Sequence, residues 1–300
     1  MFKTFFFLLT AAGGAMSADF PLTSLIPEDS GSVVGFDAGR MLGSPFGRRI
    51  LSRMQAADPR LKILFSLGFD PAKDLKQVVV ATGVEGRNSL VLVDGKFQSK
   101  QLLQGLAAGL ITGGAKKSAY EGVEVMTSGD GNALAFPDES TMLLGNEALL
   151  RTVIGRRKMA RKSDAPLLAK AGRWMASHDL WFASAGPTND FTGSIGERAT
   201  GGVLSGAILK SLDRTYGGLR FTDSVEVGVE TAARTERDAQ SMVKVMRLLS
   251  ALGAMTKGAT SGPLGFLDTL DIKAEGNLVN FKLTIPKKAF DSMSPEADAL

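Results

Sequence analysis

Few residues of this 300-residue chain have the types and spacing that catalysis requires. Its one histidine, His178, stands between Ser177 and Asp179, so a Ser-His-Asp mechanism would depend on this imidazole. Residues 180–183, which form an apolar strand pattern, follow directly. We therefore interpret His178 as a loop residue that precedes a strand, and not as a catalytic base.

The chain contains no cysteine, which excludes disulfides, thiolate nucleophiles and cysteine-bound zinc. A single histidine is too few for a two-histidine zinc motif. We expect no metal, no cofactor and no catalytic residue, and we expect stability to come from core packing alone.

Two short motifs resemble functional ones but lack their partners. Ser241 and Lys244 match the Ser-x-x-Lys of penicillin-binding enzymes, yet Ser241 falls in the second turn of a predicted helix and the accompanying motifs are missing. Asp130 opens a segment like a calcium loop, but Leu134 and Thr141 occupy positions five and twelve, where oxygen ligands are needed. We interpret the first as a chance match and the second as a hairpin turn.

Carboxylates and glycines leave two functional alternatives open. Glu124, Glu226 and Glu230 lie on the polar faces of predicted strands, where solvated glutamates are common, but a pair of acids from distant segments would suit glycoside hydrolysis. The glycine-rich stretch 193–206 lacks the Gly-Lys-Ser/Thr ending of a phosphate-binding loop. We interpret it as a long loop before a helix over 203–212, and such a loop can also line a binding site.

Positive charge is concentrated between residues 151 and 173, a stretch that contains one acid, Asp164. One interpretation is a solvated helix end, where cations are favoured. The other is a contact with an anionic surface such as lipid headgroups, lipopolysaccharide or acidic glycan. No aromatic residues alternate with these cations, so we expect no nucleic acid. The candidate contacts are Arg151, Arg156, Arg157, Lys158, Arg161 and Lys162.

Pairs of short strands followed by an amphipathic helix recur along the chain. Residues 78–81 and 90–93 form one predicted hairpin, and residues 123–144 contain three more strands before a helix that Asn146 caps. Later, an alternating strand over 225–229 precedes a helix that opens at Thr235. The pattern predicts an α+β fold of antiparallel sheets with amphipathic helices on one face, built from a duplicated hairpin–helix module.

The domain organisation follows from this recurrence. Residues 67–70 recur loosely as 264–268, each just ahead of strands, which favours an internal duplication. We expect a signal peptide over residues 1–18, an N-terminal α+β half over 19–175 and a C-terminal α+β half over 176–300. Packing of the two halves as one unit stays open.

The first 18 residues have the three-part layout of a secretory leader: Lys3, then a run of Phe and Leu, then small residues up to Ala18. The apolar run from 5 to 15 is about half of what a bilayer crossing needs, so we expect cleavage and not retention as an anchor. No later segment approaches a membrane span, which predicts a periplasmic or secreted protein without a transmembrane segment in the mature chain.

Four segments of the chain resemble a family of exported bacterial proteins of uncharacterised function. They are residues 67–81, 120–125, 134–146 and 217–227, which are strand-and-turn signatures. The likeness extends over most of the chain after the leader. It implies an exported, duplicated α+β protein and no particular catalytic residues.

These observations favour an exported, non-catalytic binding or scaffold protein of the bacterial cell envelope, whose partner is an envelope protein, glycan or lipid surface. Two alternatives stay open: a carboxylate-based hydrolase of envelope polymers, and a peripheral module that binds anionic lipid through the basic cluster.

Overall fold

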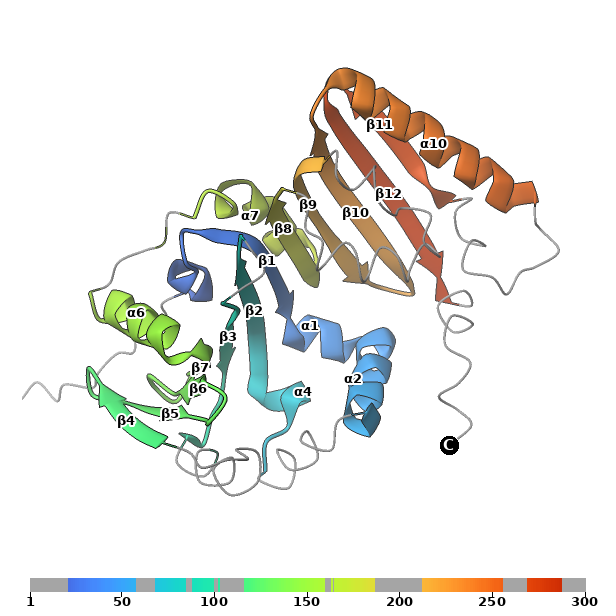
Figure 1. The fold of residues 1–300 in the computed structure, drawn as a ribbon. Coiled ribbons are helices and arrows are strands. Elements are labelled where there is room, and N and C mark those ends of the chain that lie inside the picture. Colours follow the sequence, from blue (N-terminus) through green and yellow to red (C-terminus); the bar gives the residue numbers. More distant parts are fainter. Residues whose placement is uncertain are drawn as a thin grey trace, which may run out of the picture.

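The computed structural model describes residues 21–57, 68–84, 88–99, 102, 116–159, 163, 165–186, 212–255 and 269–287. The expected signal peptide 1–18, the glycine-rich stretch 193–206, and Arg161 and Lys162 lie outside the described residues. Within them, one open sheet of twelve strands forms the framework of the molecule (Figure 1).

Every strand pairing in this sheet is antiparallel, in the order β11-β12-β10-β9-β8-β1-β2-β3-β7-β6-β5-β4. The strands are β1 (Ser30–Asp37), β2 (Leu75–Gly83), β3 (Leu90–Gly95), β4 (Lys116–Tyr120), β5 (Val123–Thr127), β6 (Asn132–Ala135), β7 (Thr141–Asn146), β8 (Leu180–Ala185), β9 (Leu212–Phe221), β10 (Ser224–Ala233), β11 (Asp271–Glu275) and β12 (Leu278–Pro286). The predicted α+β class with antiparallel pairing is confirmed.

The helices cover both faces of the sheet, whereas the sequence pattern suggested one. They are η1 (Leu22–Leu25), α1 (Ala38–Gly43), α2 (Pro45–Ala57), α4 (Pro71–Asp74), α6 (Glu147–Lys158), α7 (Leu168–Ser177) and α10 (Glu236–Met255). The elements η1, α6 and α7 pack on one face, and α1 and α10 contribute to apolar clusters on the other (Figure 1). The physical reason is that central strands carry apolar residues at consecutive positions. Val79 packs in the cluster that contains residues of η1, α6 and α7, and its neighbour Val78 packs in a separate cluster on the opposite face.

The predicted helix starts are formed by side-chain caps. The Leu149 amide donates to Oδ1 of Asn146 at 2.8 Å, which confirms Asn146 as the N-cap of α6. At α10, the Asp238 amide donates to Oγ1 of Thr235 at 3.1 Å, and that hydroxyl donates to the Asp238 carboxylate at 2.8 Å. Local sequence therefore determines where both helices begin.

A row of glycines crosses the middle of the sheet where β8 joins β1 to β9. In register, Gly35 lies opposite Trp181, Trp181 opposite Gly218, and Gly218 opposite Gly228. A Cβ on Gly35 would lie 2.4 Å from the Trp181 ring, and a Cβ on Gly218 would lie 2.5 Å from the His178 ring. The missing side chains thus leave the space in which aromatic rings lie directly on the backbone.

The sheet continues without a break across the predicted boundary at residues 175 and 176. Strand β8 pairs with β1 on one side and with β9 on the other. The hairpin β6–β7 leads to α6 and the hairpin β9–β10 leads to α10, but these two helices pack on opposite faces. The division into two halves and the internal duplication stay predictions.

The two outermost strands of the described sheet carry charged side chains. Strand β4 begins with Lys116 and Lys117, both exposed. Strand β11 presents Asp271, Lys273 and Glu275 at alternate positions, all exposed. Charges of this kind are a common device for protecting the edges of open sheets.

Candidate functional site

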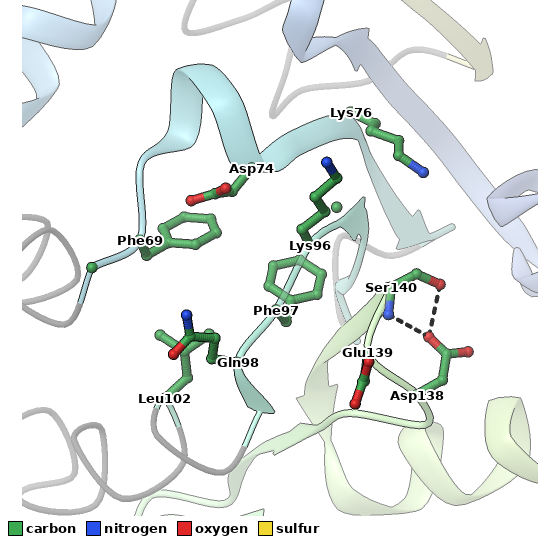
Figure 2. A pocket seen from close by; sticks show the side chains of 12 residues that line it. Phe69, Asp74, Lys76, Lys96, Phe97, Gln98, Leu102, Asp138, Glu139 and Ser140 are labelled. Atoms are coloured by element: carbon green, nitrogen blue, oxygen red, sulfur yellow. Dashed lines mark hydrogen bonds between the residues drawn. The ribbon is translucent and has the colours of Figure 1, made fainter.

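A cavity of about 690 Å³ lies where β3 leaves the sheet, and we call it the aromatic pocket (Figure 2). Its lining residues come from three segments, within 68–76, 95–102 and 138–140. The segments belong to the loop before β2, the chain after β3 and the turn between β6 and β7. The sheet brings them together because β3 pairs with both β2 and β7.

Aromatic rings form the apolar part of this pocket. The rings of Phe69 and Phe97 are stacked, with centroids 5.8 Å apart and planes 20° apart. Phe97 also contacts Phe136 in a tilted arrangement at 5.5 Å. Phe97 and Leu102 are buried, whereas Phe69 is half-buried. The half-buried Phe69 ring therefore offers an apolar surface to a ligand, and the buried Phe97 ring stacked on it holds it in place.

Backbone hydrogen bonds fix the chain that leaves β3. The Lys96 amide donates to the Asp74 carbonyl at 2.7 Å, and the Phe97 amide donates to the Glu139 carbonyl at 2.8 Å. On the same chain, a Cβ on Gly95 would lie 2.4 Å from that Asp74 oxygen, so this approach depends on glycine. The pocket wall is thus held from both sides.

Asp138 organises the turn that closes the pocket. Its Oδ1 accepts hydrogen bonds from the amide and hydroxyl of Ser140 at 2.7 and 2.8 Å, and its Oδ2 pairs with the Arg157 guanidinium (Figure 2 shows the two bonds from Ser140). Burial alone would raise the pKa of Asp138, but the bonds from Ser140 and the Arg157 charge outweigh it and hold that pKa below its usual value. The carboxylate is therefore ionised and positions the turn.

The pocket mouth carries both paired and unpaired charges. Lys76 lies 3.7 Å from the Asp94 carboxylate. Lys96 and Glu139 are exposed, and across the described residues neither side chain forms a hydrogen bond or an ion pair. These two groups are available to a ligand.

The basic cluster is paired within the chain wherever the structure describes it. Arg151 pairs with Glu147 at 2.7 Å and lies over the Tyr120 ring. Lys158 pairs with Glu121.

The other two described arginines of the cluster reach further. Arg156 donates to the Ile26 carbonyl at 2.9 Å and lies 3.8 Å from Glu28. Arg157 pairs with Asp138, as above. Glu147 lies on the same helix as Arg151, whereas Glu28, Glu121 and Asp138 reach the cluster from outside α6. Its positive charge is therefore compensated more than the sequence suggested. Its contact with an anionic surface stays a prediction.

His178, Ser177 and Asp179 do not form a catalytic triad. The Ser177 hydroxyl donates to the Arg173 carbonyl at 2.6 Å, so Nδ1 of His178, 2.8 Å from that hydroxyl oxygen, is the donor of the pair. The Asp179 carboxylate accepts instead from the Phe221 amide at 2.7 Å. The His178 ring packs against the Trp174 ring at 4.8 Å, as a structural residue would.

The imidazole should make stability depend on pH. Burial lowers the pKa of His178 below 6.5; the Arg220 charge lowers it further, while the Trp174 carbonyl and the Asp179 and Glu226 carboxylates oppose this. The unfolded chain then binds the proton more readily than the folded chain, so stability falls as the pH drops below about 6.5. Urea unfolding between pH 8 and 5.5 measures this slope, and His178→Phe should flatten it. An equal dependence of stability on pH in the two proteins would contradict this role of His178.

The remaining sequence candidates also have structural partners. Ser241 donates to the Arg237 carbonyl at 2.8 Å on α10, away from any pairing with Lys244. Asp130 accepts from the Asn132 side chain at 2.8 Å and so closes a hairpin turn.

The three glutamates considered for hydrolysis each lie beside a basic side chain. Glu124 pairs with Lys117 at 3.0 Å, Glu226 lies 3.8 Å from Arg220, and Glu230 pairs with Arg173. Within the described segments, no three acidic or histidine side chains converge to hold a metal ion. In the same part of the chain, no helix has the length and apolar content to cross a bilayer.

The sequence interpretation missed the aromatic pocket. Phe69 and the turn at 137–140 both lie in the segments that resemble exported proteins, but there they were signals of strands and turns. A pair of phenylalanines 28 positions apart has no recognisable spacing. The sequence signal that could have helped is Lys96 next to Phe97, just after the predicted strand at 90–93.

The fold defines an antiparallel α+β protein with one long open sheet. No known protein family and no curated protein matches the sequence. Among solved structures, crystal form I of TP0453 matches with a TM-score of 0.58 and 9% identity, over 92% of this chain and 97% of that chain. Crystal form III of TP0453 gives 0.59 and 10%, over 90% and 96%. At this identity the likeness shows a shared fold.

Proposed function

We propose that this protein is exported and binds a component of the bacterial cell envelope in the aromatic pocket, without catalysing a reaction. The observation that carries the proposal is the pocket itself: the stacked Phe69 and Phe97 rings share it with charged side chains that have no partner among the described residues. Its volume of about 690 Å³ falls in the range typical of sites for small ligands.

The construction of the pocket supports binding. Its wall is fixed by backbone bonds to residues 74 and 139, and Asp138 fixes the closing turn. A site that is already ordered loses little conformational entropy when a ligand binds. The pocket can therefore bind without first rearranging its frame.

The envelope part of the proposal rests on different observations. The first 18 residues have the layout of a secretory leader, and four segments of the chain resemble exported bacterial proteins. These features support the proposal that the protein lies in the periplasm or outside the cell.

Filling the pocket mouth tests this function. Gln98 lines the pocket, is exposed, and forms no side-chain hydrogen bond among the described residues, so Gln98→Trp adds bulk without removing a contact. Anilinonaphthalene sulfonate, an aromatic anion, is the fluorescent probe. We expect its affinity to fall at least about tenfold in Gln98→Trp, because the indole takes the apolar surface that the probe needs.

The matched control is Arg234→Trp, which places the same ring at an exposed position before α10. Its probe affinity should equal that of the wild type. Protein isolated from the envelope fraction serves for the titration, and the mass of its N-terminus reports on cleavage near residue 18. Equal loss of affinity in both variants, or no loss in either, would argue against the pocket as the binding site.

A further inference from the structure

Much of the backbone beside the aromatic pocket is already hydrogen-bonded within the chain. The amides of Gly95, Lys96 and Phe97 all donate to carbonyls of neighbouring segments, so they offer no donor to a ligand. The Ser140 amide is likewise bound to Asp138. Polar specificity is left to the ends of the side chains at the mouth.

Three of these side chains have no partner among the described residues: Lys96, Gln98 and Glu139. In Figure 2, the Lys96 ammonium lies on one side of the Phe97 ring and the Glu139 carboxylate on the other. Exposed charges elsewhere around the pocket are paired, as Lys73 is with Asp70 at 2.8 Å. The unpaired set thus offers a cation, an anion and an amide around an aromatic surface.

We propose that the ligand is a short peptide segment that carries one acidic and one basic group beside an aromatic or branched apolar side chain; this inference rests on the proposed function of the pocket. The apolar side chain lies on the Phe69 ring, the acidic group faces Lys96, and the basic group faces Glu139. The Gln98 amide, a donor and an acceptor, pairs with a peptide group of the ligand.

Charge complementarity favours this ligand over a fatty acid. A carboxylate head would pair with Lys96 but would leave the Glu139 carboxylate without a cationic partner from the ligand. A peptide with both signs satisfies Lys96 and Glu139 together. The occupant is therefore zwitterionic in the region that contacts the mouth.

The probe is N-acetyl-Asp-Phe-Lys-amide, measured against the wild-type protein by displacement of the fluorescent dye. Replacing its Phe with Ala should weaken binding at least about tenfold, because the ring buries apolar area. Replacing its Asp with Asn, or its Lys with Gln, should each weaken binding about threefold, the size typical of an exposed ion pair.

Two protein variants assign each charge. In the Lys96→Gln protein, the Asp peptide should bind no more tightly than its Asn analogue. The same protein should still bind the peptide with Lys more tightly than the analogue with Gln. Glu139→Gln should do the reverse. Both side chains are exposed and have no partner in the described part of the chain, so both variants should unfold at the wild-type urea concentration. Crossed losses of this kind would establish the assignment.

The outcomes separate the two proposals. If the dye binds in the pocket but peptide charges have no effect, or if decanoate displaces the dye and the peptides do not, the peptide assignment is overturned while the pocket function stands. If neither dye nor peptide responds to Gln98→Trp, the proposed function fails as well.

Discussion

Gly35→Val is expected to lower the free energy of unfolding by about 3 kcal/mol, because a side chain at this position has no space. An added Cβ would lie 2.4 to 2.6 Å from three atoms of the Trp181 ring. Trp181 is only 1% exposed and lies in the strand that joins the two ends of the sheet, so it has nowhere to move. The strain would therefore act on the centre of the fold.

Urea unfolding followed by circular dichroism measures the loss. Gly172→Ala is the matched control, because Gly172 lies in α7 with no atom within 4 Å of an added Cβ. Alanine there should raise stability by up to about 1 kcal/mol, the usual helix preference. A second variant combines Gly35→Val with Trp181→Val. Its loss of stability should be smaller than the sum of the losses measured for the two single variants. Strict additivity would show that the ring and the glycine are not coupled.

Asp138→Asn is expected to cost about 2–3 kcal/mol and to weaken binding in the aromatic pocket. The change leaves the Arg157 guanidinium, 22% exposed, without its carboxylate partner and weakens the acceptor for Ser140. The turn at 137–140 then loses its anchor. Dye titration should report a lower affinity than in the wild type, even under conditions where the variant is fully folded.

The pH dependence provides an independent check. The folded-state pKa of Asp138 lies below its ordinary value of 3.8, so the stability that its charge provides is present above that value and is lost as the pH falls below it. The stability difference between wild type and Asp138→Asn should therefore shrink below about pH 4. Arg157→Gln should show a similar cost, and the double variant should cost less than the sum. A constant difference down to pH 3 would contradict this role of the carboxylate.

Local elements were predictable because their signals are local. The strand pattern at 78–81 and 90–93 corresponds to β2 and β3, which pair as a hairpin. The caps at Asn146 and Thr235 mark the starts of α6 and α10. In each case the residues that determine the element lie within a few positions of one another, so no tertiary information was needed.

The site was not predictable, because it depends on contacts between distant segments. The lining residues within 68–76, at 95–98 and at 138–140 are brought together by the pairings of β3 with β2 and β7. The same limitation affected the basic cluster. Arg156 and Arg157 look unpaired in a stretch with one acid, yet Glu28 and Asp138 reach them from other elements.

The charged outer strands determine what happens when two copies of the molecule collide. An unpaired strand is a template onto which another chain can be added, which is the route to domain swapping and fibrils. Covering β4 with another strand would strip water from Lys116 and Lys117, and covering β11 would strip water from Asp271 and Lys273. The cost of removing water from these charges opposes both unions. The twelve-stranded ribbon can thus stay open at both ends without polymerising.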